Sequence, residues 1–287
     1  KNFLAGPAVI SNVLKEADMQ TLFDIEKTWI MNAAQRNSNA DNFIQSLDVQ
    51  AFTFKEFARI FESPVRAKAE QLLNTRQSDW LKRFYALCAD AYDDLDYSTS
   101  NAFVRNMKQS VVIRSSKGEM YRSSDIYILP VNVALITKTT HIVEPTFVLS
   151  STKTDKACEK IRTFFHDELD VREYGPRIEI EKALSRYKND DWKVDDKYYQ
   201  DILAFAKYCS QNSDLDFSQY ELFLYVDANG DIYSSHAKEL FLGKAYGNEN
   251  GELLAEALDE NCLYNEYAEK YKDKDLQAFI SFTSGSI

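Results

Sequence analysis

Apolar residues recur at helical spacing over much of the chain, which predicts a mainly helical protein. The clearest apolar stripes are Trp80, Leu81, Phe84, Tyr85, Leu87 and Cys88 in the first half, and Tyr199, Ile202, Leu203, Phe205, Ala206 and Cys209 in the second. Two stretches, 110–121 and 220–233, read instead as pairs of short strands around a glycine turn. They predict antiparallel hairpins. We therefore expect an α+β fold, mostly helical with small antiparallel β-hairpins.

The two halves of the chain share short motifs in the same order. Gly118-Glu-Met-Tyr121-Arg-Ser matches Gly230-Asp-Ile-Tyr233-Ser-Ser. In addition, Leu47-Asp-Val49 matches Leu169-Asp-Val171, and in both of these segments a Phe stands four residues before the Leu. The intervals are roughly 115–120 residues, and a looser match lies at Phe279–Ile287. We expect an amino-terminal helical segment over 1–46 and two tandem, similar α+β modules over 47–168 and 169–287. The alternative is that short apolar patterns recur by chance.

The hairpin residues have expected roles. Gly118 and Gly230 stand where a tight turn requires a positive φ, which glycine adopts without steric cost. Tyr121 and Tyr233 follow on the returning strands, and we expect their rings to pack on the neighbouring apolar helices. The alternative is that both tyrosines are exposed and form a repeated contact site for a ligand.

Composition narrows the class of protein. The chain has 287 residues, 45% apolar and 28% charged, with 8 Gly and 5 Pro, which excludes a disordered chain and argues against an all-β fold. No apolar run is long enough to cross a bilayer. The net charge of −11 lies wholly in residues 151–287, so duplex nucleic acid is not an expected partner of that half.

Four widely spaced cysteines, Cys88, Cys158, Cys209 and Cys262, suggest neither a disulfide framework nor a zinc site. Free thiols suit a reducing compartment, so we expect a cytoplasmic location. The chain begins at Lys1 without a Met or a signal peptide, which suggests a fragment of a longer protein.

No known catalytic motif appears in the sequence. His141, His166 and His236 are far apart, and there is neither a P-loop nor a G-x-G-x-x-G segment. Acidic pairs flank Trp192, and Asp227-Ala-Asn-Gly230-Asp resembles part of an EF-hand, although a hairpin turn explains it better. We expect no catalytic residue, no cofactor and no metal, and we assign the aromatic helix residues to the core.

The order of motifs resembles the region that follows the GHKL-class ATPase domain in sacsin-like proteins, which share this class with the ninety-kilodalton heat-shock chaperones. The matching segments are Ser78–Tyr85, Gly118–Pro130, Phe164–Tyr174, Ile178–Tyr187 and the second hairpin through Tyr246. The ATPase itself combines a Glu-x-x-x-Asn helix, an Asp-x-Gly-x-Gly segment and a Gly-rich lid, and this combination is absent here.

The resemblance implies a non-catalytic scaffold, or a client- or partner-binding region, of a larger chaperone-like or defence-related ATPase protein. A rival hypothesis is a hydrolase or nuclease that uses acidic groups with His141 or His236. A third is a small-molecule sensor that uses the aromatic residues. A cluster of three acids or histidines around one pocket would favour the hydrolase or nuclease.

Overall fold

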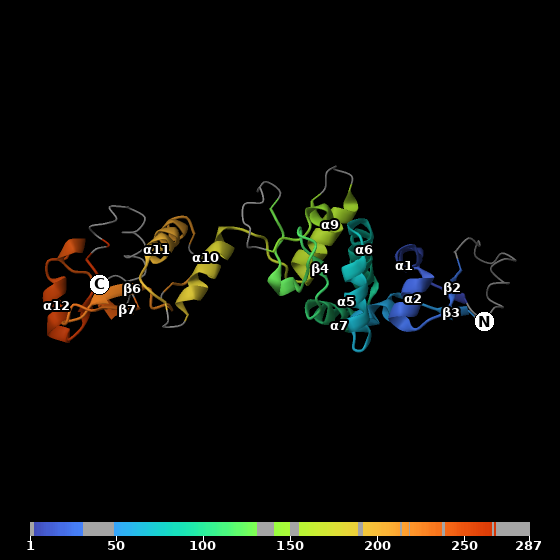
Figure 1. The fold of residues 1–287 in the computed structure, drawn as a ribbon, viewed down its shortest axis with the longest axis horizontal. Coiled ribbons are helices and arrows are strands. Elements are labelled where there is room, and N and C mark those ends of the chain that lie inside the picture. The colour runs from blue at the N-terminus through green and yellow to red at the C-terminus, as the bar shows by residue number, and fades with distance from the viewer. Residues whose placement is uncertain are drawn as a thin grey trace. The chain divides into compact units, whose positions relative to one another are not determined.

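A computed structural model shows an α+β fold, with helices predominating over short two- and three-stranded sheets (Figure 1). The structure describes residues 3–30, 49–130, 141–149, 155–188, 192–212, 214–217, 219–236, 239–265 and 267. The chain divides into two compact units, Lys1–Tyr174 (unit 1) and Gly175–Ile287 (unit 2). Within the described ranges, no helix combines the length and apolar character needed to cross a bilayer.

Unit 1 opens with a small parallel sheet and two short helices. The elements are β1 (Phe3–Ala5), α1 (Ala8–Val13), α2 (Glu16–Phe23), β2 (Thr28–Trp29) and β3 (Val49–Ala51), and the strand order is β2-β1-β3. This part was expected to be a separate helical segment. Instead it contains a sheet, and Leu4, Ile10 and Met19 belong to the core of unit 1 because they are buried against the helices that follow.

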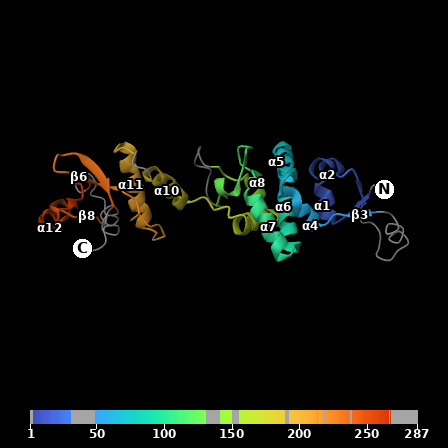
Figure 2. The same ribbon diagram turned by 90° about the horizontal axis from the view of Figure 1, so that it is seen from below.

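Four helices and a 3-10 turn follow the sheet. They are α4 (Phe54–Phe57), the turn 58–61, α5 (Val65–Thr75), α6 (Ser78–Asp94) and α7 (Tyr97–Lys108). Thr53 and Glu56 form a capping box at α4, and the Asp96 carboxylate accepts the Thr99 N–H at the start of α7. Figure 2 shows α1 and α2 beside α5 and α6, in agreement with the contacts of α1 with α6 and of α2 with α5.

Unit 1 closes with a hairpin and a second helical layer. The elements are β4 (Ile113–Arg114), β5 (Met120–Tyr121), a 3-10 turn (Ser123–Asp125), α8 (Pro145–Val148), α9 (Lys156–Thr163) and a π-helical turn (Phe164–Glu168). α9 packs against α6, whose apolar stripe is buried: Phe84, Tyr85 and Cys88 are fully inaccessible to solvent. The sequence prediction that these residues belong to the core is confirmed.

Unit 2 has its own apolar core. Its elements are α10 (Pro176–Leu184), a 3-10 turn (Ser185–Tyr187), α11 (Asp196–Cys209), β6 (Phe223–Val226), β7 (Ile232–Ser235), β8 (Leu240–Phe241), a 3-10 turn (Lys244–Tyr246), α12 (Gly251–Leu258) and β9 (Asn261–Cys262). β6 and β7 form the second hairpin, and β8 pairs in parallel with β9. Tyr198, Tyr267, Phe205 and Phe217 are large, fully buried side chains of this core.

Among the residues that the structure describes, one kind of parallel pairing, which we call the parallel motif, occurs three times, the second time as the single bridge of Tyr127 to Ile142. Its first strand is β1, 127–128 or β8, and its second strand is β2, 142–143 or β9. In each copy the second strand ends with the same hydrogen bond to the first strand, from an N–H to a carbonyl: Ile30 to Leu4 (2.8 Å), Val143 to Tyr127 (2.9 Å) and Leu263 to Phe241 (2.8 Å).

A third strand joins the first two copies of the parallel motif. β3 pairs with β1, and Glu173 bridges to Ile128, both in parallel. The N–H groups of Phe52 and Tyr174 donate to Ala5 and Ile128 respectively, both at 2.8 Å. The structure does not describe the corresponding stretch after the third copy, which contains the looser match at Phe279–Ile287.

The hairpins attach to the second and third copies in the same way. Ser115 bridges to Val143 and Tyr225 to Leu263, both antiparallel. The next residue along the second strand then donates to the hairpin, Glu144 to the Arg114 carbonyl (3.0 Å) and Tyr264 to the Leu224 carbonyl (2.8 Å). The two units therefore share hairpin, parallel motif and strand pairing, in the same order along the chain.

The observed division falls after Tyr174, whereas the sequence placed a module boundary after residue 168. The later division has a physical reason, because the segment between these positions is bonded within unit 1. Val171 is buried and donates its N–H to the Phe165 carbonyl at 2.9 Å, and Tyr174 donates to Ile128.

Candidate binding site

The two turn glycines adopt the conformation that the sequence indicated. Gly118 has φ 88° and Gly230 has φ 89°, in the left-handed region that L side chains rarely adopt. Each lies just before the returning strand of its hairpin, β5 or β7.

The two hairpin tyrosines do not share one environment. Tyr121 is half-buried against the core of unit 1 and stacks on the ring of His141, with centroids 4.0 Å apart. Its hydroxyl donates to Glu119. Tyr233 is 48% exposed and stacks on Tyr225 across the hairpin. The expected packing of both rings on the apolar helices is therefore wrong for Tyr233, because β7 turns this side chain toward solvent.

The tyrosines that are buried where each hairpin meets its neighbouring helix come from the helix instead. The Tyr85 hydroxyl, on α6, donates to the Val112 carbonyl (2.8 Å) and accepts the Arg114 N–H (3.2 Å). On α11, the Tyr198 hydroxyl donates to the Leu222 carbonyl (2.8 Å). Tyr85 belongs to the first apolar stripe of the sequence, whereas Tyr198 stands one residue before Tyr199, the tyrosine assigned to the second stripe.

In unit 2 a second phenol completes the contact. The Tyr267 hydroxyl bonds to that of Tyr198 and accepts the Leu224 N–H at 3.1 Å. The matching position in unit 1 is Phe147, since each follows the second strand and donates its N–H three residues back, to Glu144 or Tyr264. Phe147 has no hydroxyl, so Tyr85 serves both backbone groups alone. Burial raises the pKa of Tyr85, Tyr198 and Tyr267 well above the usual value.

The remaining repeat positions precede Phe52 or Tyr174 in the chain. Val49 begins β3 and is half-buried, whereas Leu169 and Val171 are fully buried. Leu47 lies outside the described residues. Val49 and Val171 each precede, by three positions, the residue that donates to the first strand of the parallel motif.

The three histidines lie in separate places. His166 is exposed and bonded to Asp167 (2.7 Å), His236 lies 3.6 Å from Glu221, and His141 stacks on Tyr121. Within the described ranges, no group of three or more His, Cys, Asp or Glu side chains is placed to hold a metal ion.

The four cysteines are free thiols. The Asp227 carboxylate accepts the N–H groups of Asn229 and Asp231, both at 2.9 Å, which confirms a hairpin turn there.

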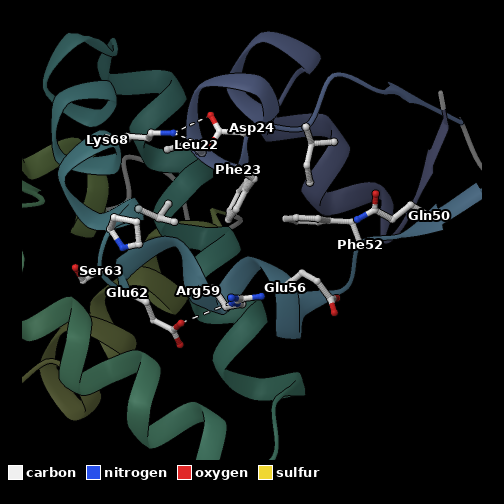
Figure 3. Close-up of a pocket in the computed structure, with 13 residues that line it drawn as sticks. Leu22, Phe23, Asp24, Gln50, Phe52, Glu56, Arg59, Glu62, Ser63 and Lys68 are labelled. Atoms are coloured by element: carbon white, nitrogen blue, oxygen red, sulfur yellow. Dashed lines mark hydrogen bonds and ion pairs between the residues drawn. The ribbon is translucent and has the colours of Figure 1, made fainter. Parts of the chain in front are cut away.

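A pocket of about 250 Å³ opens in unit 1 between α2, β3, α4 and α5 (Figure 3). Its floor is apolar. Leu22 and Phe52 are buried there, and Phe23, Ile25 and Val65 are partly buried beside them. The rings of Phe23 and Phe52 meet edge to face with centroids 5.0 Å apart. A cavity of about 150 Å³ already holds benzene, so this pocket has room for one large apolar or aromatic group.

Charged groups at the rim of the pocket are paired with one another. Lys68 contacts Asp24 at 2.9 Å, and Arg59 lies 3.7 Å from Glu62. Glu56 caps α4, and its hydrogen bond from the Thr53 hydroxyl holds its pKa below the usual value. The rim therefore presents both signs of charge, and its carboxylates Asp24, Glu56 and Glu62 each have a partner.

The Glu-x-x-x-Asn spacing of the GHKL nucleotide site does occur at Glu70 and Asn74 on α5, but Glu70 has another role in the structure. Its carboxylate accepts the Val111 N–H at 3.0 Å, which fixes the start of the hairpin segment. No protein-family model, curated protein or solved structure significantly matches the chain. The resemblance to the sacsin-like ATPase proteins therefore stays a prediction.

Proposed function

We propose that this chain is a non-catalytic scaffold, built from repeats, that binds a protein partner or client. The observation that carries the proposal is the recurrence of the parallel motif and its hairpin with the same hydrogen bonds in both units. Repeated modules that share one internal framework commonly serve as extended binding surfaces. The sequence resemblance adds the proposal that the chain works within a larger chaperone-like or defence-related ATPase protein, in a reducing cytoplasm suited to its free thiols.

The pocket beside α2 is the proposed contact point for that partner. Its apolar floor suits one large apolar side chain, and the ion pairs at its rim offer hydrogen-bonding groups to the flanking peptide. A strongly charged small molecule fits less well, because the lining has no concentration of one sign of charge.

The rival hydrolase or nuclease function has less support. His141 contacts an aromatic ring and His236 lies 3.6 Å from Glu221, and among the described residues no group of three His, Cys, Asp or Glu side chains is placed to hold a metal ion. We accordingly expect no ATP turnover by this chain, and a steady turnover that one substitution in the chain abolishes would contradict the proposal.

The binding proposal can be tested with a phage-displayed library of random peptides selected on the intact chain. We expect enriched peptides to share an aromatic or large aliphatic residue. Val65→Phe fills the pocket and should weaken their binding at least tenfold. Val9→Phe is the matched control, since Val9 is 41% exposed on α1 and does not line the pocket.

Two results would overturn this placement of the site. One is the absence of any enriched peptide on a folded chain. The other is equal binding of the selected peptides to the Val65→Phe variant and the unaltered chain. Circular dichroism of both variants checks that the fold is kept.

A further inference from the structure

Helix α12 has the reverse of the usual amphipathic arrangement. Its small residues Gly251 and Ala255 are buried, whereas Leu253, Leu254 and Leu258 are 64%, 45% and 60% exposed. Three neighbouring leucines exposed on a single helix are a marker of an interaction surface.

The parallel motif identifies the counterpart of α12. In the first copy, α1 and α2 connect the first strand to the second, and in the third copy α12 makes the same connection. Both α2 and α12 end at an aspartate in the left-handed conformation, Asp24 with φ 56° and Asp259 with φ 58°. Counting back from these aspartates places Leu253, Leu254 and Leu258 at the positions of Asp18, Met19 and Phe23.

In unit 1 these positions are covered by the helices that follow. Asp18 is 3% exposed and Met19 is fully buried. α2 packs on α5, and α1 packs on α6. Polar contacts fix the same arrangement: Arg76 pairs with Asp18, Lys68 pairs with Asp24 at 2.9 Å, and the Trp80 indole N–H donates to the Val13 carbonyl at 3.1 Å.

We propose that the leucine face of α12 is a docking surface for a helix pair of the α5–α6 type, that is, for a further copy of this repeat. α2 has the Asp18 carboxylate, which pairs with Arg76, and α12 has Leu253 at the corresponding position. At this one position the proposed contact at α12 is therefore apolar, whereas the contact at α2 is an ion pair. This inference concerns how one repeat holds the next and is independent of partner binding at the pocket.

The test is an extended protein, in which a second copy of residues 53–174 is joined after Ile287. The added α5 then follows α12 at the same distance in sequence as α5 follows α2. Hydrogen–deuterium exchange is measured for amides 251–260 with and without the extension. We expect the extension to slow this exchange at least tenfold. Combined Leu253→Glu, Leu254→Glu and Leu258→Glu changes should restore the original rate, and Glu256→Gln, on the same helix, should not.

Two outcomes would overturn the proposal. In the first, both copies of α6 are protected but amides 251–260 exchange as fast as before. In the second, half of the α6 peptides exchange rapidly, because the added helix pair has lost the cover of α1 and α2 and has found none on α12. Peptide binding at the pocket is measured separately, so failure here leaves the proposed function unaffected.

Discussion

At the scale of single residues, one hydroxyl group decides how each hairpin is held to its helix. In unit 1 the Tyr85 hydroxyl bonds both to a backbone carbonyl and to the N–H two residues further along. In unit 2 the Tyr198 hydroxyl bonds to the carbonyl and the Tyr267 hydroxyl to the N–H. The difference follows from Phe147, which stands in the place of Tyr267 and packs its ring on Tyr85 at 5.1 Å. Buried backbone groups must be paired, so unit 1 depends on one phenol and unit 2 on two.

This difference predicts unequal effects of two conservative substitutions. Tyr85→Phe leaves Val112 and Arg114 without their partner and should lower the free energy of unfolding by about 2–3 kcal/mol. Tyr267→Phe should cost less than about 1 kcal/mol, because the Tyr198 hydroxyl remains to take both groups, as Tyr85 does. Urea unfolding of the two variants measures this, and equal losses would contradict it.

At the scale of elements, the hairpins depend on turns that reverse the chain within a few residues. Gly118 donates its N–H to the Ser115 carbonyl at 2.9 Å, and Gly230 donates to Asp227 at 3.1 Å. Both turns require a positive φ, and a side chain at either position would crowd the following carbonyl. The turns therefore set the register of each hairpin.

Gly230→Ala should lower stability by about 1 kcal/mol through backbone conformation alone, because a Cβ there meets no atom within 4 Å. Gly118→Ala should cost a similar amount, since the Cβ meets the Arg114 guanidinium only at an ordinary contact distance of 3.4 Å. Ser116→Ala, an exposed change in the same loop as Gly118, is the control and should have almost no effect. Thermal unfolding midpoints distinguish these outcomes, and an unchanged midpoint for Gly230→Ala would contradict the role of the positive φ.

At the scale of the whole molecule, each unit has a separate core with buried tyrosines in it. Tyr85 lies in the core of unit 1, and Tyr198 and Tyr267 lie in that of unit 2. Burial is the largest cause of their raised pKa values. The native protein therefore keeps protons that the unfolded chain releases at alkaline pH.

The consequence is a loss of stability above pH 10. Below that pH both states keep the phenol protons; above it the unfolded tyrosines ionise near their ordinary pKa of about 10, and the folded ones do not. Each buried tyrosine should contribute a fall of up to about 1.4 kcal/mol per pH unit. Urea unfolding between pH 8 and about 11 measures this slope, and Tyr85→Phe should reduce it. A slope that the substitution leaves unchanged would contradict the assignment.

The expected helices and hairpins were predictable because their signals are local. The stripe from Trp80 to Cys88 forms α6, and the turns at Gly118 and Gly230 close the hairpins. The parallel motif was not predicted, because its strands are two or three residues long and have no alternating pattern of their own. Its partners lie far apart in sequence, as with Leu4 and Trp29, so only the folded chain brings them together.

The sequence by itself determined the fold class, the places of the main helices and hairpins, and the order of the repeated motifs, because helical periodicity and glycine turns act over a few residues. Only the tertiary structure decided which tyrosines are buried, since Tyr233 and Tyr198 look alike in sequence and differ in the face that their elements present to the core. It also decided that the leucines of α12 face outward. Burial depends on what packs against an element, and this is a property of contacts between distant segments rather than of the segment itself.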